Sequence, residues 1–307
     1  MLAKEGYYGT VGITMQGVVI WFDNSDPGVG YAANILSHIL GPVRMAPLSG
    51  PPPLPCTPAL LLIGLRGDGF ARGGFLESLG RVCRAEGCSR VIVFLLECDA
   101  ACRLSALDAL RDCASHLPRD VVVFPGADGM PRRAEVIEYG LSLRDELLAS
   151  GKAAPPGQVR ARAEEFLGAH NTCTLCTGSA GRVRATPVEY HYHDGTLVIL
   201  SEGGEKFAHI LRNPQVSVAV YEPYTGMDRL AGVQVQGEAV LVTPGTSLYK
   251  REVRARGLDP DQVMALPCLL HMIIVTMTRL EFIHYSWQRE GYDLRQVYWF
   301  PHGERAA

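Results

Sequence analysis

The sequence has no long cluster of lysine or arginine residues. Of its 307 residues, 29 are Lys or Arg and 32 are Asp or Glu, so its formal net charge is −3. A surface with this balance offers no electrostatic attraction to nucleic acid or to an acidic membrane. We therefore expect a small molecule as the partner, and neither nucleic acid nor a membrane.

The sequence also has no apolar run typical of a membrane span or a signal peptide. The run Val11–Phe22 contains polar residues, ends in an acidic loop and has no small-residue cleavage site after it. The run Val263–Val275 is interrupted by Pro267 and His271. Both patterns favour a cytoplasmic protein.

A disulfide framework and a metal site are both poorly supported. The nine cysteines are odd in number and spread along the chain, which fits a reducing compartment. Cys173 and Cys176 have the spacing of metal ligands, but residues three apart in a strand point to opposite faces. His191 and His193 share a strand face, a pattern more common in half-exposed strands than in metal sites. We predict no metal site, and no arrangement of residues indicates a catalytic side chain.

The amino-terminal half alternates apolar runs with helical patterns. The runs RVIVFLLE and ALLLIGL are continuously apolar, as in parallel strands covered by helices on both faces. Strands are predicted at Gly17–Phe22, Val43–Ala46, Ala59–Leu65, Arg90–Leu96 and Val121–Phe124, and helices at Gly30–Leu40, Gly73–Glu86, Cys102–Ser115 and Arg132–Leu148. Five strands of this kind predict a doubly wound, flavodoxin-like α/β domain over residues 1–152.

The segment Gly151–Gln158, GKAAPPGQ, is the best candidate for a linker, and a second domain is predicted over residues 158–307. A helix is expected at Val159–Leu167. Strands are expected at Cys173–Cys176, Arg184–His193, Thr196–Leu200, Val216–Tyr221, Gly232–Val242 and Ile273–Tyr285. Many strands and few helices predict a small antiparallel β-barrel, closed or nearly closed.

A hairpin is predicted inside this second domain. Asp194-Gly195 is a strong two-residue turn, because both positions of such a turn need positive φ. It places His193 opposite Thr196 and, if the pairing continues, Val188 opposite Ser201. The side chains of Arg184, Thr186, Val188 and Ser201 then share one face of the sheet.

The stretch LVILSEGGEKFAHILRNPQVSVAV follows this hairpin. The chain leaves the strand through Glu202-Gly203-Gly204 and enters a helix near Glu205, whose first backbone N–H groups have no partner within the helix. Ser201, Lys206 and Arg184 are predicted to converge there. This combination favours an anion site, most plausibly for a phosphate.

The order of these motifs resembles the FMN-binding split-barrel family related to pyridoxamine 5′-phosphate oxidase. RATPVEY precedes the hairpin, Lys206 lies seven residues before Asn213-Pro214, and Gly237-Glu238 is expected to end a later strand. The resemblance covers about Val159 to Tyr285. It implies an antiparallel split β-barrel and a homodimer with FMN in clefts at the subunit interface.

The resemblance also implies which residues hold the cofactor. The phosphate is expected at Arg184, Ser201 and Lys206, and the isoalloxazine ring beside the strand backbone at Ala185–Val188. The full set expected to bind FMN is Arg184, Ala185, Thr186, Pro187, Val188, Leu200, Ser201, Lys206 and Gln234.

The chain departs from the family pattern at three places. Glu205 stands where the oxidases have an arginine, and Gly232 where they have a flavin-contacting glutamine, so Gln234 is only its same-face neighbour. The tail offers Arg295, Trp299 and His302 in a different arrangement from the oxidases' substrate-phosphate cluster. FMN stays the expected cofactor. The three departures argue against pyridoxamine phosphate as the substrate.

The first domain has a loop, Asp23–Gly30, where flavodoxin-like domains hold the FMN phosphate. Ser25 is its only hydroxyl, and its two aspartates repel a phosphate, so no tight site is expected there. The loop Arg66–Gly69 occupies the place of a second flavin-contacting loop but also fits an ordinary surface turn. Whether this domain holds a second flavin stays open.

Three functions remain open at the level of the sequence. The first is an FMN-dependent oxidoreductase of unknown substrate, in which the flavin carries the chemistry. The second is a non-catalytic flavin-binding protein, such as a sensor or carrier. The third is a haem-binding split-barrel protein with His271, His284 or a tail histidine as axial ligand.

Overall fold

The computed structural model describes residues 17–41, 43–49, 60–67, 75–84, 88–193 and 195–301. The chain divides into two compact units, Met1–Gly151 and Lys152–Ala307. Asp194 of the predicted hairpin turn, most of the proline-rich stretch between the predicted strands Val43–Ala46 and Ala59–Leu65, Asp68-Gly69 and His302 lie outside the described residues. None of the helices in the described ranges is long and apolar enough to cross a membrane.

The first unit contains a parallel five-stranded sheet in the order β2-β1-β3-β4-β5. Its strands are β1 Val18–Phe22, β2 Arg44–Pro47, β3 Leu60–Arg66, β4 Arg90–Leu96 and β5 Arg119–Phe124. The apolar runs predicted as covered strands are β3 and β4, which are buried along almost their whole length. A short hairpin follows β5, made of β6 Gly126–Ala127 and β7 Met130–Pro131.

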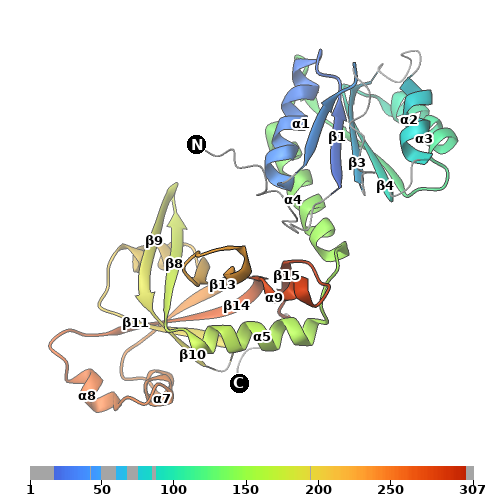
Figure 1. The fold of residues 1–307 in the computed structure, drawn as a ribbon. Coiled ribbons are helices and arrows are strands. Elements are labelled where there is room, and N and C mark those ends of the chain that lie inside the picture. The colour runs from blue at the N-terminus through green and yellow to red at the C-terminus, as the bar shows by residue number, and fades with distance from the viewer. Residues whose placement is uncertain are drawn as a thin grey trace. The chain divides into compact units, whose positions relative to one another are not determined.

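Helices cover both faces of this sheet. They are α1 Pro27–Leu40, α2 Phe75–Arg84, α3 Ala100–Cys113 and α4 Arg133–Ser150. The helix α1 packs against α4, and α2 packs against α3. Figure 1 shows the two pairs on opposite sides of the strands. The predicted doubly wound α/β arrangement is therefore present in this unit.

The second unit is built on an antiparallel sheet in the order β10-β11-β14-β13-β12-β8-β9, with β15 beside β14. The strands are β8 Thr172–Ser179, β9 Arg182–Glu189, β10 His191–His193, β11 Thr196–Ser201, β12 Gln215–Tyr221, β13 Ala231–Val242, β14 His271–His284 and β15 Arg295–Trp299. The strands β9 and β11 also approach each other, so the sheet curls toward closure. This arrangement confirms the predicted split β-barrel.

One predicted strand is divided in the structure. The segment Arg184–His193 bends at Tyr190, and β9 and β10 lie at opposite ends of the strand order. Tyr190 is buried, and its hydroxyl donates to the backbone oxygen of Leu167 at 2.7 Å. Its backbone N–H donates to the backbone oxygen of Asn171, also at 2.7 Å. These bonds turn the chain from one edge of the barrel to the other.

The bend overturns part of the predicted register. His193 does pair with Thr196, as predicted. Beyond Tyr190 the extrapolation is wrong, because Val188 pairs with Cys173 of β8 and Ser201 pairs with His271 of β14. Hairpin register extends only as far as the two strands stay together, and here they separate after three residue pairs.

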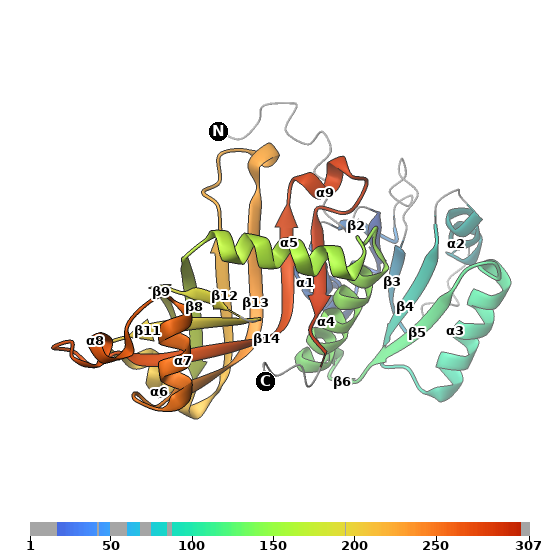
Figure 2. The ribbon, with the colours of Figure 1, turned by 90° about the horizontal axis from the view of Figure 1, so that it is seen from below.

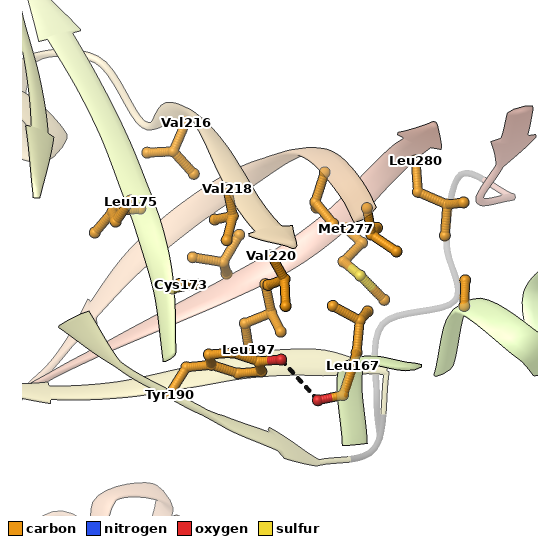
Figure 3. Close-up of a cluster of buried hydrophobic side chains, with 14 of the residues drawn as sticks. Leu167, Cys173, Leu175, Tyr190, Leu197, Val216, Val218, Val220, Met277 and Leu280 are labelled. Carbon is orange, nitrogen blue, oxygen red and sulfur yellow. Dashed lines mark hydrogen bonds between the residues drawn. The ribbon is translucent and has the colours of Figure 1, made fainter. Parts of the chain in front are cut away.

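The helix α5, Pro156–Ala169, covers the core of the second unit. It begins within the segment predicted as linker, and its buried residues Val159, Ala163 and Leu167 recur every four positions on one face. Figure 2 shows α5 running across the strands of the sheet. Figure 3 shows buried side chains of this core, and the hydrogen bond that the Tyr190 hydroxyl donates to the backbone oxygen of Leu167 in α5.

Four shorter helices complete the second unit: α6 Glu205–Arg212, α7 Ser247–Ala255, α8 Pro260–Met264 and α9 Ser286–Arg289. The helix predicted near Glu205 is α6. The pair Gly237-Glu238, expected at the end of a strand, lies instead inside β13, where the register with β14 shifts between Gln236 and Gly237. A Cβ atom at Gly237 would collide with the backbone oxygen of Thr276, so glycine permits this close approach of two strands.

Candidate cofactor-binding site

Lys206 lies at the start of α6 and is folded back over the preceding turn. Gly203 and Gly204 have φ of 134° and 106°, a region that favours glycine, and they turn the chain sharply from β11 into the helix. The Lys206 ammonium donates to the backbone oxygen of Gly203 at 2.6 Å. The side chain is thereby directed into the turn, and the residue is only 7% exposed.

The charge of Lys206 is poorly compensated by the protein. Burial lowers the pKa of Lys206, and the nearby Arg184 cation lowers it further. Within the described part of the chain, no carboxylate lies within 4.0 Å of its ammonium. A buried ammonium with unused donors is stabilised by a bound anion, because burying an unpaired charge costs free energy.

Arg184 reaches the same turn from the edge strand β9. Its guanidinium donates to Oε2 of Glu205 at 3.1 Å, and both side chains are about half exposed. The neighbouring strand places Thr177 directly opposite Arg184. The structure thus brings Arg184 and Lys206 together, the arrangement expected from the sequence.

The predicted hydroxyl residues have free hydrogen-bonding capacity. Thr186 lies two residues after Arg184 on the same side of β9, and its buried Oγ1 has no hydrogen-bond partner in the described chain. Ser201 ends β11, directly before the turn that leads to Lys206. Buried polar atoms are normally hydrogen-bonded, so the orphaned Thr186 hydroxyl fits a site that a polar ligand completes.

The remaining predicted residues occupy other positions. Val188 packs against the barrel core, whereas Leu200 packs beneath α7 and α8. Ala185 and Pro187 point to the opposite, outer face of β9, because side chains alternate along a strand. A ligand at this edge strand can therefore meet Arg184 and Thr186 on one face and the strand edge beside Pro187.

Gln234 belongs to the outer face but not to this edge. Pro187 pairs with Thr174, and the same row continues through Ala219 to Gln234. Two strands, β8 and β12, therefore separate Gln234 from Pro187 within one subunit. A ligand at Pro187 would therefore reach Gln234 only across these two strands or on another copy of the chain.

Two pockets share lining residues at the end of α5, and the smaller of them reaches the edge strand β9 at Pro187. The smaller has a volume of about 460 Å³ and is lined by Pro187, Thr174 and Tyr221 among others. The larger has a volume of about 610 Å³. Both are lined by His170 and Glu222, which are joined by a 2.9 Å contact between Nε2 and Oε1. Sequence reasoning missed this pair, because 52 residues separate its members.

Aromatic rings line much of the larger pocket. Phe166 stacks on His170 with ring centroids 4.2 Å apart, and Phe282 lies 5.5 Å from Phe166. His284 continues this row and stacks on Tyr285 at 4.6 Å. Burial lowers the pKa of His284, and the cation of Arg162 lowers it further.

The lowered pKa of His284 predicts a loss of stability in acid. As the pH falls below about 6.5, the unfolded state binds a proton before the folded state does, so folding becomes less favourable. The wild type should therefore lose more stability between pH 7.5 and 5.5 than His284→Asn. Urea unfolding at both pH values measures this difference, and His191, whose pKa is also lowered, is present in both proteins. Equal losses would show that His284 does not titrate in this range.

The candidate phosphate loop of the first unit is filled by its own side chains. The Asp26 carboxylate caps α1 by accepting from the Val29 N–H at 3.0 Å, and Arg66 binds both Asp26 and Glu97. A Cβ atom at Gly28 would collide with the backbone oxygen of Gly129, so the β6–β7 hairpin lies directly against this end of the helix. A carboxylate therefore already holds the position where a phosphate would meet the helix.

Comparisons with known proteins bear on the second unit. Residues 159–264 match the family described as pyridoxamine 5′-phosphate oxidase. No curated protein matches the chain.

Solved structures similar to this chain each cover less than half of it. A FAD-binding protein from Mesorhizobium loti is 22% identical over 39% of this chain and 89% of its own, with a TM-score of 0.32. A FAD-binding protein from Mycobacterium smegmatis is 17% identical over 39% and 91%, with a TM-score of 0.32. A haem storage protein from Vibrio cholerae is 17% identical over 38% and 88%, with a TM-score of 0.32. These likenesses are too weak to assign a ligand to this chain.

The family match and the curled antiparallel sheet agree with the resemblance read from the sequence. They cover the segment that carries Arg184, Ser201 and Lys206. The family match and the resemblance read from the sequence therefore fall on the same segment, residues 159–264, and name the same family, that of pyridoxamine 5′-phosphate oxidase.

Proposed function

We propose that the second domain binds FMN, with the phosphate held by Lys206 and Arg184. The observation that carries this proposal is the buried Lys206 ammonium, which has no carboxylate within salt-bridge distance in the described residues. The family of the surrounding segment supports a flavin as the source of the anion. The hydroxyls of Thr186 and Ser201 add hydrogen-bonding groups at the same edge.

The proposed cofactor determines the proposed chemistry. Bound FMN supplies hydride or electron transfer, so the protein has to position the cofactor and no side chain has to act as acid or base. We therefore propose an FMN-dependent oxidoreductase of unknown substrate. A sensor or carrier that binds FMN without turnover uses the same residues and differs only in lacking reduction by a donor.

We also propose that the protein is a homodimer through the outer face of the barrel. Val183 on the edge strand is 90% exposed, and the exposed residues around it on this face include the uncharged Ala185, Pro187, Ser217, Gln234 and Gln236, with the charged Glu238 beside them. A second copy covering this face removes apolar surface from water and brings a second Gln234 near each strand edge. Sedimentation equilibrium should give twice the 33.4 kDa mass of the chain, and a monomer at all concentrations would contradict the proposal.

A haem-binding protein is the second candidate. Two of the histidines lining the larger pocket, His170 and His284, are the observation that favours it. His284 makes its contact to Ser286 through Nδ1, at 2.7 Å, which leaves Nε2 for a ligand. The earlier candidate His271 is less suited, since its ring packs edge-on against Phe207 at 5.4 Å.

For the first domain we propose a flavodoxin-like fold that docks a redox partner. Its strand order is the one found in flavodoxin-like proteins. Because Asp26 and Arg66 fill the phosphate position, we assign the flavin of this protein to the second domain alone. This assignment predicts one flavin for each chain.

The absorption spectrum of the purified protein tests these alternatives. A flavin spectrum with FMN identified by mass after release supports the proposal, and bleaching by NAD(P)H separates an oxidoreductase from a carrier. A Soret band favours the haem-binding candidate. A colourless protein that takes up neither added FMN nor haem contradicts both.

A further inference from the structure

Glu205 lies at the candidate site, and its negative charge opposes the proposed ligand. Its carboxylate lies between two partners from different elements. Oε2 accepts from the guanidinium of Arg184 at 3.1 Å, and Oε1 lies 3.7 Å from Nε2 of His209. The Glu205 carboxylate thus accepts the hydrogen bond that Nη1 of Arg184 would otherwise be free to donate to a ligand.

A buried pair of residues, His209 and Thr177, supports the position of the Glu205 side chain. His209 is almost completely buried, and its Nδ1 lies 3.1 Å from Oγ1 of Thr177, which is also buried. Thr177 is in turn the strand partner of Arg184. The four residues therefore form a closed ring of contacts that ties the edge strand β9 to the helix α6 through β8.

The carboxylates near the turn offset its cations. Arg184 and Lys206 contribute two positive charges, whereas Glu205 contacts Arg184 directly and Glu202 acts on Lys206 through space. A phosphate monoester carries close to two negative charges at neutral pH. Such a ligand meets the repulsion of Glu205 at the guanidinium that it needs.

We propose that Glu205 is a specificity-determining residue that occupies Arg184 in place of a phosphate and so weakens the binding of phosphate monoesters. This inference rests on the proposed cofactor site. Glu205 acts as an internal competitor: the cofactor phosphate has to displace its carboxylate from Arg184 or share the guanidinium with it. The ring portion of the cofactor is unaffected, so the residue sets how much affinity the phosphate adds.

The test compares ligands with and without the phosphate. Glu205→Gln keeps the shape of the side chain and removes its charge, and it is expected to tighten FMN binding by about 5- to 10-fold. Its affinity for riboflavin, which has the same ring and no phosphate, is expected to stay within about 2-fold. Fluorescence quenching of the two flavins gives both constants.

A matched control is Glu202→Gln, because this exposed carboxylate lies in the same turn and contacts no cation directly. It should change FMN affinity by less than about 2-fold. The inference is overturned if Glu205→Gln leaves FMN affinity unchanged or weakens it, or if riboflavin tightens equally. Hydrogen exchange of α6 and β9 verifies that the fold is retained.

A second probe separates this inference from the cofactor assignment. Inorganic phosphate binding can be followed by ³¹P NMR line broadening in the wild type and in Glu205→Gln. If neither the wild type nor Glu205→Gln binds flavin, but phosphate binds more tightly to Glu205→Gln than to the wild type, the proposed cofactor is wrong and the role of Glu205 stands. If neither flavin nor phosphate responds to the substitution, the role of Glu205 is refuted.

Discussion

Replacing Lys206 by methionine is expected to weaken FMN binding by about 10- to 100-fold. A hydrogen bond to a charged group contributes about 1.5–3 kcal/mol, and every 1.4 kcal/mol is a factor of ten in affinity. Lys206 is the most buried cation of the candidate site, so water screens its interaction with a phosphate less than it screens that of Arg184. The effect should therefore exceed that of Glu205→Gln and have the opposite sign.

Methionine is the informative substitution at this position. It retains most of the buried aliphatic volume and removes only the ammonium, whose pKa is lowered by burial. Riboflavin affinity should stay within about 2-fold, because riboflavin has no phosphate. Lys250→Met, on the helix α7, provides the control. An equal loss of FMN and riboflavin binding would show that Lys206 supports the site structurally and not through the phosphate.

Replacing Trp287 by alanine is expected to lower the free energy of unfolding of the second unit by about 3–5 kcal/mol. The side chain is fully buried in the barrel core. Phe282 and Tyr292 pack edge-to-face on the indole with centroids 6.0 and 6.1 Å away, and the Arg162 guanidinium lies 4.4 Å from its centre. Removing the ring leaves a cavity and forfeits all three contacts.

Two further substitutions make the test specific. The indole N–H of Trp287 is buried and has no hydrogen-bond partner in the described chain, so Trp287→Phe removes an unsatisfied donor and should cost clearly less than alanine. Trp299→Ala, at a site that is 60% exposed, should cost less than about 1 kcal/mol. Hydrogen exchange in β12–β14 under native conditions reports on this unit alone. Similar costs for Trp287→Ala and Trp299→Ala would contradict the assignment of Trp287 to the core.

The local elements of this protein were largely readable from its sequence. Continuous apolar runs marked β3 and β4, and the spacing around Val159 marked α5. The turn from β11 into α6 was equally clear, because the glycines Gly203 and Gly204 are followed at once by a helical pattern. These features depend on residues a few positions apart, where backbone sterics and side-chain periodicity act directly.

The partners of strands were harder to predict. The sequence placed Val188 opposite Ser201 because nothing local shows that the chain bends at Tyr190. The bend depends on hydrogen bonds from Tyr190 to Leu167 and Asn171, about twenty residues earlier. Register beyond a tight turn is set by such long-range packing, and a single sequence does not display it.

The sequence by itself determined that a lysine would follow two glycines at the end of a strand, and that an arginine-bearing strand would precede it. Only the tertiary structure decided that Lys206 is buried with no carboxylate of the described residues in salt-bridge contact, and that Glu205 forms an ion pair with Arg184. It also decided that Asp26 and Arg66 fill the phosphate position of the first domain. The physical reason is that charge pairing depends on which side chains meet in space, and burial decides how strongly each pair acts.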